Sequence, residues 1–260
     1  MQLSLKLSSP DNIKRFVDRF REKYVSVDLV RIGGDSDGGY LLPDNLKDVK
    51  YCFSAGVSHT SDFEGQLSKD YGIKSFMADA SVTAPAYNDD NFHFRANFIG
   101  SSPENGFITL SDWIEDCIGD DASEKVLQMD IEGGEYDVLA YESAENFAAF
   151  STLIIEFHMV QTIAEHNFLQ MVSAIFEKLY LNFSIAHVHP NNTVPVQKVA
   201  GVLVPRIMEV TFIRNDLVDR FRNHNDIALP HPLDRKNETK RPDIVMPEIW
   251  WAKAAAENAS

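Results

Sequence analysis

Blocks of apolar and polar residues alternate along the chain, and between residues 50 and 181 they predict a β-α-β series. Short apolar runs alternate with stretches in which apolar residues recur at helical spacing. This alternation is typical of a mostly parallel sheet with helices on both faces. The expected strands are 50–57, 73–80, 92–100, 125–131 and 152–160, and the expected helices are 61–72, 111–119, 135–147 and 165–181.

The two ends of the chain depart from this series. Ser9-Pro10 starts a stretch with helical spacing, so residues 10–24 are expected to form an amphipathic helix. Residues 183–190 and 205–214 read as two strands without a helix between them, and such strands pair antiparallel at a sheet edge. The predicted organisation is an N-terminal helix segment (1–27), one α/β domain (28–215) and an extended C-terminal wrap (216–260).

The net charge and the hydropathy of the chain restrict the kinds of partner that are expected. The chain of 260 residues carries a net charge of −15, which argues against nucleic acid as the main partner. No apolar run approaches the roughly 20 residues of a membrane helix, and the N-terminus lacks the apolar core of a signal peptide. A cytoplasmic protein without a membrane partner is therefore expected. Cys52 and Cys117 have no CxxC spacing, which disfavours a disulfide or thiolate site. The oligomeric state stays open.

Candidate ligand-binding residues fall at the ends of the predicted strands, where open α/β sheets bind their ligands. Gly56 ends the first strand, and Asp79 follows 23 residues later, close to the spacing of about 20 at which an acid binds a ribose diol. Neither GxGxxG nor GxxxxGK[ST] occurs, so a ligand with ribose but no phosphate fits better. S-adenosylmethionine is the common ligand of that kind. The alternative for Asp79 is a capping or surface acid.

The next two strands end in acids and a histidine. Asp130 and Glu132 follow one strand, while Glu156 and His158 share one face of the next. A buried acid and imidazole are costly unless they pair or hold a ligand, so a site and a satisfied core pair are both open. Asp130, Glu156 and His158 are the predicted ligands of Mg, Mn or Fe. Glu135 is expected at the surface, in the first turn of the following helix.

Three histidines are candidates for a general base that takes a proton from a hydroxyl. His187 and His189 share a face at the end of strand 183–190, and His158 is the third. Histidine suits this task because its unperturbed pKa lies near neutrality. His189 is slightly preferred. The alternative for "HVHPNN" is a plain turn without chemistry.

An ordered set of motifs resembles the FkbM-type family of S-adenosylmethionine-dependent methyltransferases. The resemblance covers roughly residues 28–215. It rests, in chain order, on "RIGGDSDGGYLLPDNL", "CFSAGVSHTSDFE", "SFMADASV", "ITLSDWI", "LQMDIEGGEYDVL", "IIEFH", "HVHPNN" and "MEVTFIR". Each motif alone is weak evidence for the family, whereas the complete set in this order is specific.

The resemblance implies a Rossmann-like class I methyltransferase fold with a mostly parallel seven-stranded sheet. It implies methyl transfer from S-adenosylmethionine to a hydroxyl of a sugar, glycan or sugar nucleotide. Gly56 would approach the cofactor and Asp79 would bind its ribose. Asp130, which forms the DxEG pattern with Glu132, would face the cofactor and the acceptor. The first motif reads Ser54-Ala55-Gly56 instead of a glycine-rich run, and Ser54 is expected at the cofactor together with Gly56. Residues 37–40, including Tyr40, are expected to fold over the cofactor or acceptor, and a plain β-turn is the alternative.

Two functions from other classes stay open. One is a non-catalytic module that binds a nucleotide or sugar nucleotide and has lost the reaction, although a decayed site has little physical reason to keep burying acids. The other is a hydrolase with a metal held by carboxylates and histidine, which would act without S-adenosylmethionine. Binding of the cofactor product separates both from a methyltransferase.

Overall fold

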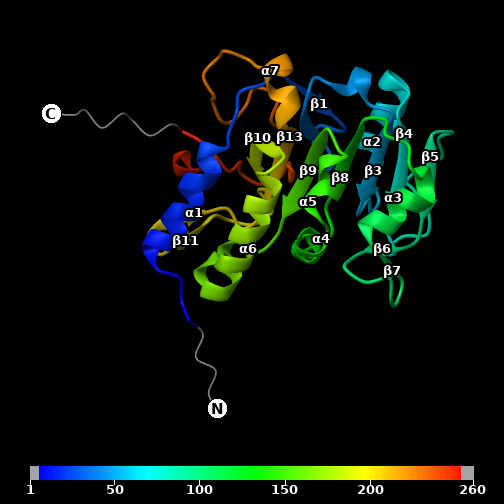
Figure 1. Cartoon of the computed structure of the whole chain (residues 1–260). Helices are drawn as coiled ribbons and strands as arrows, with labels where there is room; N and C mark the ends of the chain where they lie inside the picture. Colours follow the sequence, from blue (N-terminus) through cyan, green and yellow to red (C-terminus); the bar gives the residue numbers. More distant parts are fainter. Residues whose placement is uncertain (1–5, 253–260) are drawn as a thin grey trace.

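The computed structural model describes residues 6–252 and contains a seven-stranded sheet in the order β10-β13-β9-β8-β3-β4-β5 (Figure 1). Six strands run parallel, and β13 runs antiparallel to both of its neighbours. The strands are β3 (Tyr51–Ala55), β4 (Lys74–Ala78), β5 (Phe92–Arg95), β8 (Lys125–Met129), β9 (Thr152–Phe157), β10 (Phe183–Pro190) and β13 (Met208–Arg214). The mixed α/β class and the mostly parallel sheet predicted from the sequence are confirmed.

The strand order reverses beside β3. The chain runs outward through β4 and β5 on one side and then returns to build β8 and β9 on the other side. In such doubly wound sheets a crevice opens at the carboxyl ends of the strands at this point. β10 and β13 pair antiparallel as predicted, but β13 inserts between β9 and β10.

Alternating side chains along the strands divide the core between the two faces of the sheet. Phe53 packs in the larger core, whereas its neighbour Cys52 packs in the smaller one. The larger core also holds residues of α1 (Pro10–Glu22), α3 (Leu110–Ile118), α4 (Glu135–Tyr141), α5 (Ala144–Ala148) and α6 (His166–Leu179). The smaller core holds residues of the hairpin β1 (Leu29–Ile32) and β2 (Tyr40–Pro43), and of α2 (Asp62–Gln66) with its π-helical extension Leu67–Tyr71.

The N-terminal helix and the C-terminal tail pack together. The Ser9 hydroxyl caps α1 by accepting from the Asn12 amide, as its sequence predicts. Trp250, in the 3₁₀ turn Glu248–Trp250, is fully buried and meets Phe20 edge to face at a centroid distance of 5.3 Å. α1 and α6 lie side by side, with Phe16 against Phe176 (Figure 1). The tail is therefore part of the core.

Four segments differ from their predicted form. The expected helix 135–147 breaks into α4 and α5, because Ser143 adopts an extended conformation and caps the second helix. The expected strand 92–100 ends early, and its last residues form β6 (Phe98–Ile99) beside β7 (Phe107–Ile108). The chain segment that connects β10 to β13 contains a separate hairpin of β11 (Gln197–Val199) and β12 (Val202–Val204). The tail carries the 3₁₀ turn Asn215–Leu217 and the short helix α7 (Val218–Phe221).

The predicted terminal segments are described only in part, because residues 1–5 and 253–260 lie outside the described residues. Among the helices of residues 6–252, none has the length and apolar character needed to cross a membrane.

Candidate active site

A cavity of about 390 Å³ lies at the carboxyl ends of β3, β4 and β8. This volume is in the usual range of small-molecule sites, roughly 300–1,000 Å³. Gly56, Asp79 and Asp130 line it, and the rings of Phe98 and Phe107 form part of its apolar wall. The three residues expected to meet a nucleoside therefore lie around one cavity.

Gly56 occupies a place that no other residue fits. Its φ is +81°, and a Cβ built on it would lie 1.7 Å from the backbone oxygen of Asp130. Its amide donates to the Ala78 carbonyl at 3.0 Å, and the Asp130 amide donates to the Ala55 carbonyl at 3.0 Å. These bonds hold the ends of three strands together, so glycine is required by close backbone approach as well as by conformation.

Asp79 lies in the cavity wall and also holds two loops. Its side chain accepts from the Ser58 amide at 2.8 Å and from the Ser81 amide at 2.7 Å, with the residue only 5% exposed. Each carboxylate oxygen keeps a second lone pair, so the same group can accept from a diol. Asp79 therefore does cap backbone amides, which was the alternative role, and its binding of a ribose stays a prediction.

A smaller cavity of about 60 Å³ adjoins the first and shares Gly56, Ser58 and Asp130 with it. Its wall includes Asp37, Tyr40, Glu64 and Gln128.

Ser54 lies behind this wall. It is fully buried, and its hydroxyl lies within hydrogen-bond distance of the side-chain oxygens of Glu64 and Gln128. Gln128 in turn donates to the Tyr40 hydroxyl at 3.2 Å. Ser54 therefore positions residues of the cavity wall and does not line either cavity itself. Sequence reasoning missed Glu64 and Gln128, although a glutamine inside the apolar strand "KVLQM" is a signal.

His158 lies next to the two cavities among carboxylates. Its Nε2 is 3.3 Å from Glu156 Oε1, 3.4 Å from Glu132 Oε2 and 3.9 Å from Asp130 Oδ1. Ligand atoms of Asp130, Glu156 and His158 all lie within 4.8 Å of one another. The predicted metal-binding residues are therefore brought together, and two carboxylates with one imidazole suit Mg, Mn or Fe.

The predicted surface position of Glu135 is wrong. The residue is fully buried, and its Oε1 lies 2.8 Å from His158 Nδ1. Positive φ angles at Glu132 (57°) and Gly133 (105°) turn the chain sharply, so the first turn of α4 faces inward. The same oxygen accepts from the amides of Ile131 and Gly133. Glu135 therefore orients the His158 ring and directs Nε2 at the other acids.

Further buried polar groups extend the site across the sheet. Glu209 of β13 lies directly opposite Glu156 of β9, and Asn191 donates to both oxygens of Glu156 at 3.3 and 3.4 Å. Asn237 from the tail donates to Glu209 at 2.6 Å and to Asp37 at 2.9 Å. Glu209 was missed because the sequence does not reveal that β13 inserts beside β9.

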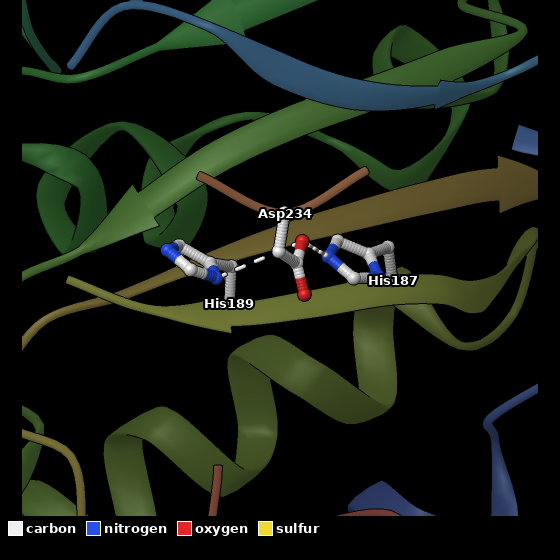
Figure 2. A group of neighbouring side chains, drawn as sticks. All are labelled: His187, His189 and Asp234. Atoms are coloured by element: carbon white, nitrogen blue, oxygen red, sulfur yellow. Dashed lines mark hydrogen bonds and ion pairs between the residues drawn. The ribbon is translucent and has the colours of Figure 1, made fainter. Parts of the chain in front are cut away.

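His187 and His189 lie in a second group, around Asp234 of the tail. Figure 2 shows the two rings on either side of the Asp234 carboxylate, with Nε2 of His187 at 2.8 Å and Nδ1 of His189 at 3.7 Å from Oδ1. The three histidines proposed as bases are therefore not equivalent: His158 lies behind the wall residues Asp130 and Glu132, and the other two face the tail. No sequence signal pointed to Asp234.

The electrostatics of the site are dominated by buried carboxyl groups, whose ionised forms are disfavoured by burial and by one another. Burial raises the pKa of Asp130 to about 7, with further increases from Glu132 and Asp37 and an opposing effect of His158. Burial, together with Asp130 and Glu209, raises the pKa of Glu156 well above its usual range. Burial alone would lower the pKa of His158, but the bond to Glu135 and the neighbouring charges raise it. A cation bound here would stabilise the ionised forms of these carboxyl groups.

Replacing Gly56 tests the close approach of the strand ends. In Gly56→Ala the new Cβ meets the Asp130 backbone, which cannot move without breaking the sheet, so a loss of several kcal/mol in unfolding free energy is expected. Gly72→Ala is the matched control: its φ is +68° but nothing lies within 4 Å of its Cβ, so it should cost only about 1–2 kcal/mol. Equal losses in urea denaturation would contradict the clash.

The pH dependence of stability tests the burial of Asp130. In the unfolded chain an aspartate loses its proton near pH 3.9, and in the folded protein Asp130 loses it near pH 7. Between these values the folded state binds more protons, so the unfolding free energy should fall as the pH rises. With EDTA present to remove metal, Asp130→Asn should show a smaller fall, whereas Asp90→Asn, at an exposed position, should match the wild type. Equal slopes for Asp130→Asn and wild type would contradict the assignment.

Comparison with known proteins identifies no family. No protein-family model and no curated protein matches the chain. Solved structures that are similar in part include the following two. A "putative hemolysin" from Lactococcus lactis shares 11% identity at a TM-score of 0.33, covering 81% of this chain and 89% of its own. MtNAS, in complex with MTA and tNA, shares 13% identity at a TM-score of 0.27, covering 64% and 53%. Likeness at this level carries no argument about function, which therefore rests on the site itself.

Proposed function

We propose that the protein is an S-adenosylmethionine-dependent O-methyltransferase with a Rossmann-like class I fold. The observation that carries this proposal is the pair of joined cavities at the strand reversal, with Gly56 and Asp130 at their junction. The doubly wound order with one reversed strand agrees with the fold that the FkbM-type resemblance implies.

The chemistry of the cavity walls favours this cofactor over a nucleotide. S-adenosylmethionine carries a sulfonium, an ammonium and a carboxylate group and is therefore a net cation, and the smaller cavity is lined by the acids Asp37, Asp62, Glu64 and Asp130. The larger cavity offers Asp79 for a ribose and the Phe98 and Phe107 rings for a base. Acids in both cavities would repel a polyphosphate, and no glycine-rich cradle for phosphate is present in the sequence.

The proposed reaction is a direct displacement, in which an acceptor hydroxyl oxygen attacks the sulfonium methyl carbon in line while a base takes the hydroxyl proton. Holding the three reacting atoms in line, away from water, supplies much of the rate. His158 is the favoured base, because Glu135 holds its Nδ1 and its Nε2 faces Asp130, which lies where the two cavities meet. Its raised pKa makes it a stronger base and leaves less of the neutral form at pH 7.

A divalent metal fits the same place. Asp130, Glu156 and His158 would hold Mg, Mn or Fe, and Asp130 Oδ1 is buried without a hydrogen-bond partner among the described residues. When bound, such an ion would lower the pKa of the acceptor hydroxyl. His158 would then act as a ligand, and Glu135 would orient it.

The acceptor within this proposal is a hydroxyl of a sugar, glycan or sugar nucleotide. It is taken from the FkbM-type resemblance. The row formed by Glu156 and Glu209 could accept hydrogen bonds from several hydroxyl groups, which suits a polyol.

One observation favours a metal-dependent hydrolase as a second candidate. Asp37, Glu156 and Glu209 also bring ligand atoms within 4.8 Å, and they share Glu156 with the first metal group. Two metals bridged by a carboxylate are a frequent arrangement in hydrolases. This candidate requires no S-adenosylmethionine.

Calorimetry with S-adenosylhomocysteine, with and without EDTA, tests the cofactor. Binding of about one molecule per chain is expected in both conditions, without competition from ATP. Asp79→Asn should weaken binding at least about tenfold, because one acceptor oxygen is lost at the ribose. Asp89→Asn is the matched control, since Asp89 also holds a loop, through Ser68 and Asn91, but lines neither cavity. Absence of binding in both conditions would refute the methyltransferase. Metal-dependent ester hydrolysis in the absence of S-adenosylmethionine would favour the hydrolase.

Turnover of histidine variants tests the base. With nucleotide sugars screened as acceptors and release of S-adenosylhomocysteine as the signal, His158→Gln should reduce turnover about a hundredfold or more. Cofactor-product binding should stay unchanged, because His158 lines neither cavity. His187→Gln should reduce turnover less than about tenfold. A larger loss in His189→Gln than in His158→Gln would instead identify His189 as the base.

A further inference from the structure

His187, His189 and Asp234 form a group outside the two joined cavities, which we call the His-Asp-His group. Two members come from β10 and one from the C-terminal tail. None lines either joined cavity. His187 instead lines a separate cavity of about 270 Å³, whose other walls come mostly from residues within 24–29 and 223–232. The group is therefore a second concentration of metal-ligating side chains that the proposed reaction does not use.

The geometry of the group brings three ligand atoms to one point. One ligand atom from each residue lies within 4.8 Å of the others, and the side chains are only 4–6% exposed. Figure 2 shows both rings directed at the same carboxylate from opposite sides. Asp234 Oδ1 lies 2.8 Å from His187 Nε2 and 3.7 Å from His189 Nδ1.

Hydrogen bonds alone do not account for the burial of the His189 ring. At 3.7 Å, the contact between its Nδ1 and Asp234 is too long for a hydrogen bond. Its Nε2 is buried and has no partner among the described residues. An imidazole buried in this way is costly unless a ligand engages it. A metal ion between Nδ1 and Oδ1 would bind the ring through Nδ1, whose 3.7 Å separation from Asp234 leaves room for an ion, and Nε2 would then carry the ring proton.

Local structure fixes the ligands in place beforehand. Residues two apart on a strand share a face, and the irregularity between Ile185 and His187 redirects that face. In the tail, the His231 amide donates to Asp234 Oδ2 at 2.7 Å, which leaves Oδ1 facing the rings. An outer hydrogen bond of this kind orients a carboxylate ligand.

We propose that His187, His189 and Asp234 bind one divalent transition-metal ion that fastens the C-terminal tail to β10. Two imidazole nitrogens and one carboxylate oxygen suit Zn²⁺ or Fe²⁺, and three protein ligands leave a further position for water. Three residues further along, Asn237 holds Asp37 and Glu209, so the ion would also stabilise the wall of the active site.

Zinc binding to the full-length chain tests this proposal. After EDTA treatment and dialysis, titration with Zn²⁺ should reveal a site that His189→Gln and Asp234→Asn weaken at least about tenfold. His158→Gln removes a ligand of the other candidate metal group and should leave this site intact. His231→Gln is a control beside the group. Zinc should also slow proteolysis between residues 222 and 230 in the wild type but not in Asp234→Asn.

Two results would overturn the proposal. One is the absence of zinc binding, which would leave Asp234 as an ion-pair partner of the two rings. The other is a zinc site that survives in His189→Gln and Asp234→Asn but is lost in His158→Gln. If a variant does not fold, as judged by circular dichroism, X-ray absorption at the zinc edge of the wild type decides: two imidazole ligands support the proposal, and fewer contradict it.

Discussion

Burial of carboxylates at the carboxyl edge of the sheet is the constraint on which the site depends. Glu156 lies close to both Asp130 and Glu209, and the pKa of each of the three carboxyl groups is raised mainly by burial. Protonated His158 carries a compensating positive charge, whereas the neutral amides of Asn191 and Asn237 donate hydrogen bonds to Glu156 and Glu209. The arrangement favours a cationic ligand, whether a sulfonium or a divalent metal, and disfavours a phosphate.

The segments that cover the sheet edge come from both ends of the chain. The loop after β1 brings Asp37 over the edge, and the C-terminal tail brings Asn237, which bonds both Asp37 and Glu209. Asp234 meets the histidines of β10 from the same tail. The tail is anchored further on by Trp250, buried against α1. Segments remote in sequence therefore complete the site because the sheet edge alone leaves its acids without partners.

Much of the fold and part of the site could be predicted from local pattern. Apolar periodicity predicted the strands and helices because burial of one face or one stripe selects those periods. Period-two alternation brought Glu156 and His158 together, and the parallel order added Asp130. Ser54 was expected at the cofactor, but it lies behind Glu64 and Gln128, since a strand residue pointing into the core reaches a cavity only through its neighbours.

The sequence by itself determined which residue types follow each strand and hence that acids and histidines gather at one edge. Only the tertiary structure decided which of these acids and histidines contact one another. Insertion of β13 placed Glu209 opposite Glu156, the turn at Glu132 buried Glu135 against His158, and the tail brought Asp234 to His187 and His189. These contacts join residues whose partners are set by strand order and loop direction. Local periodicity carries no information about either.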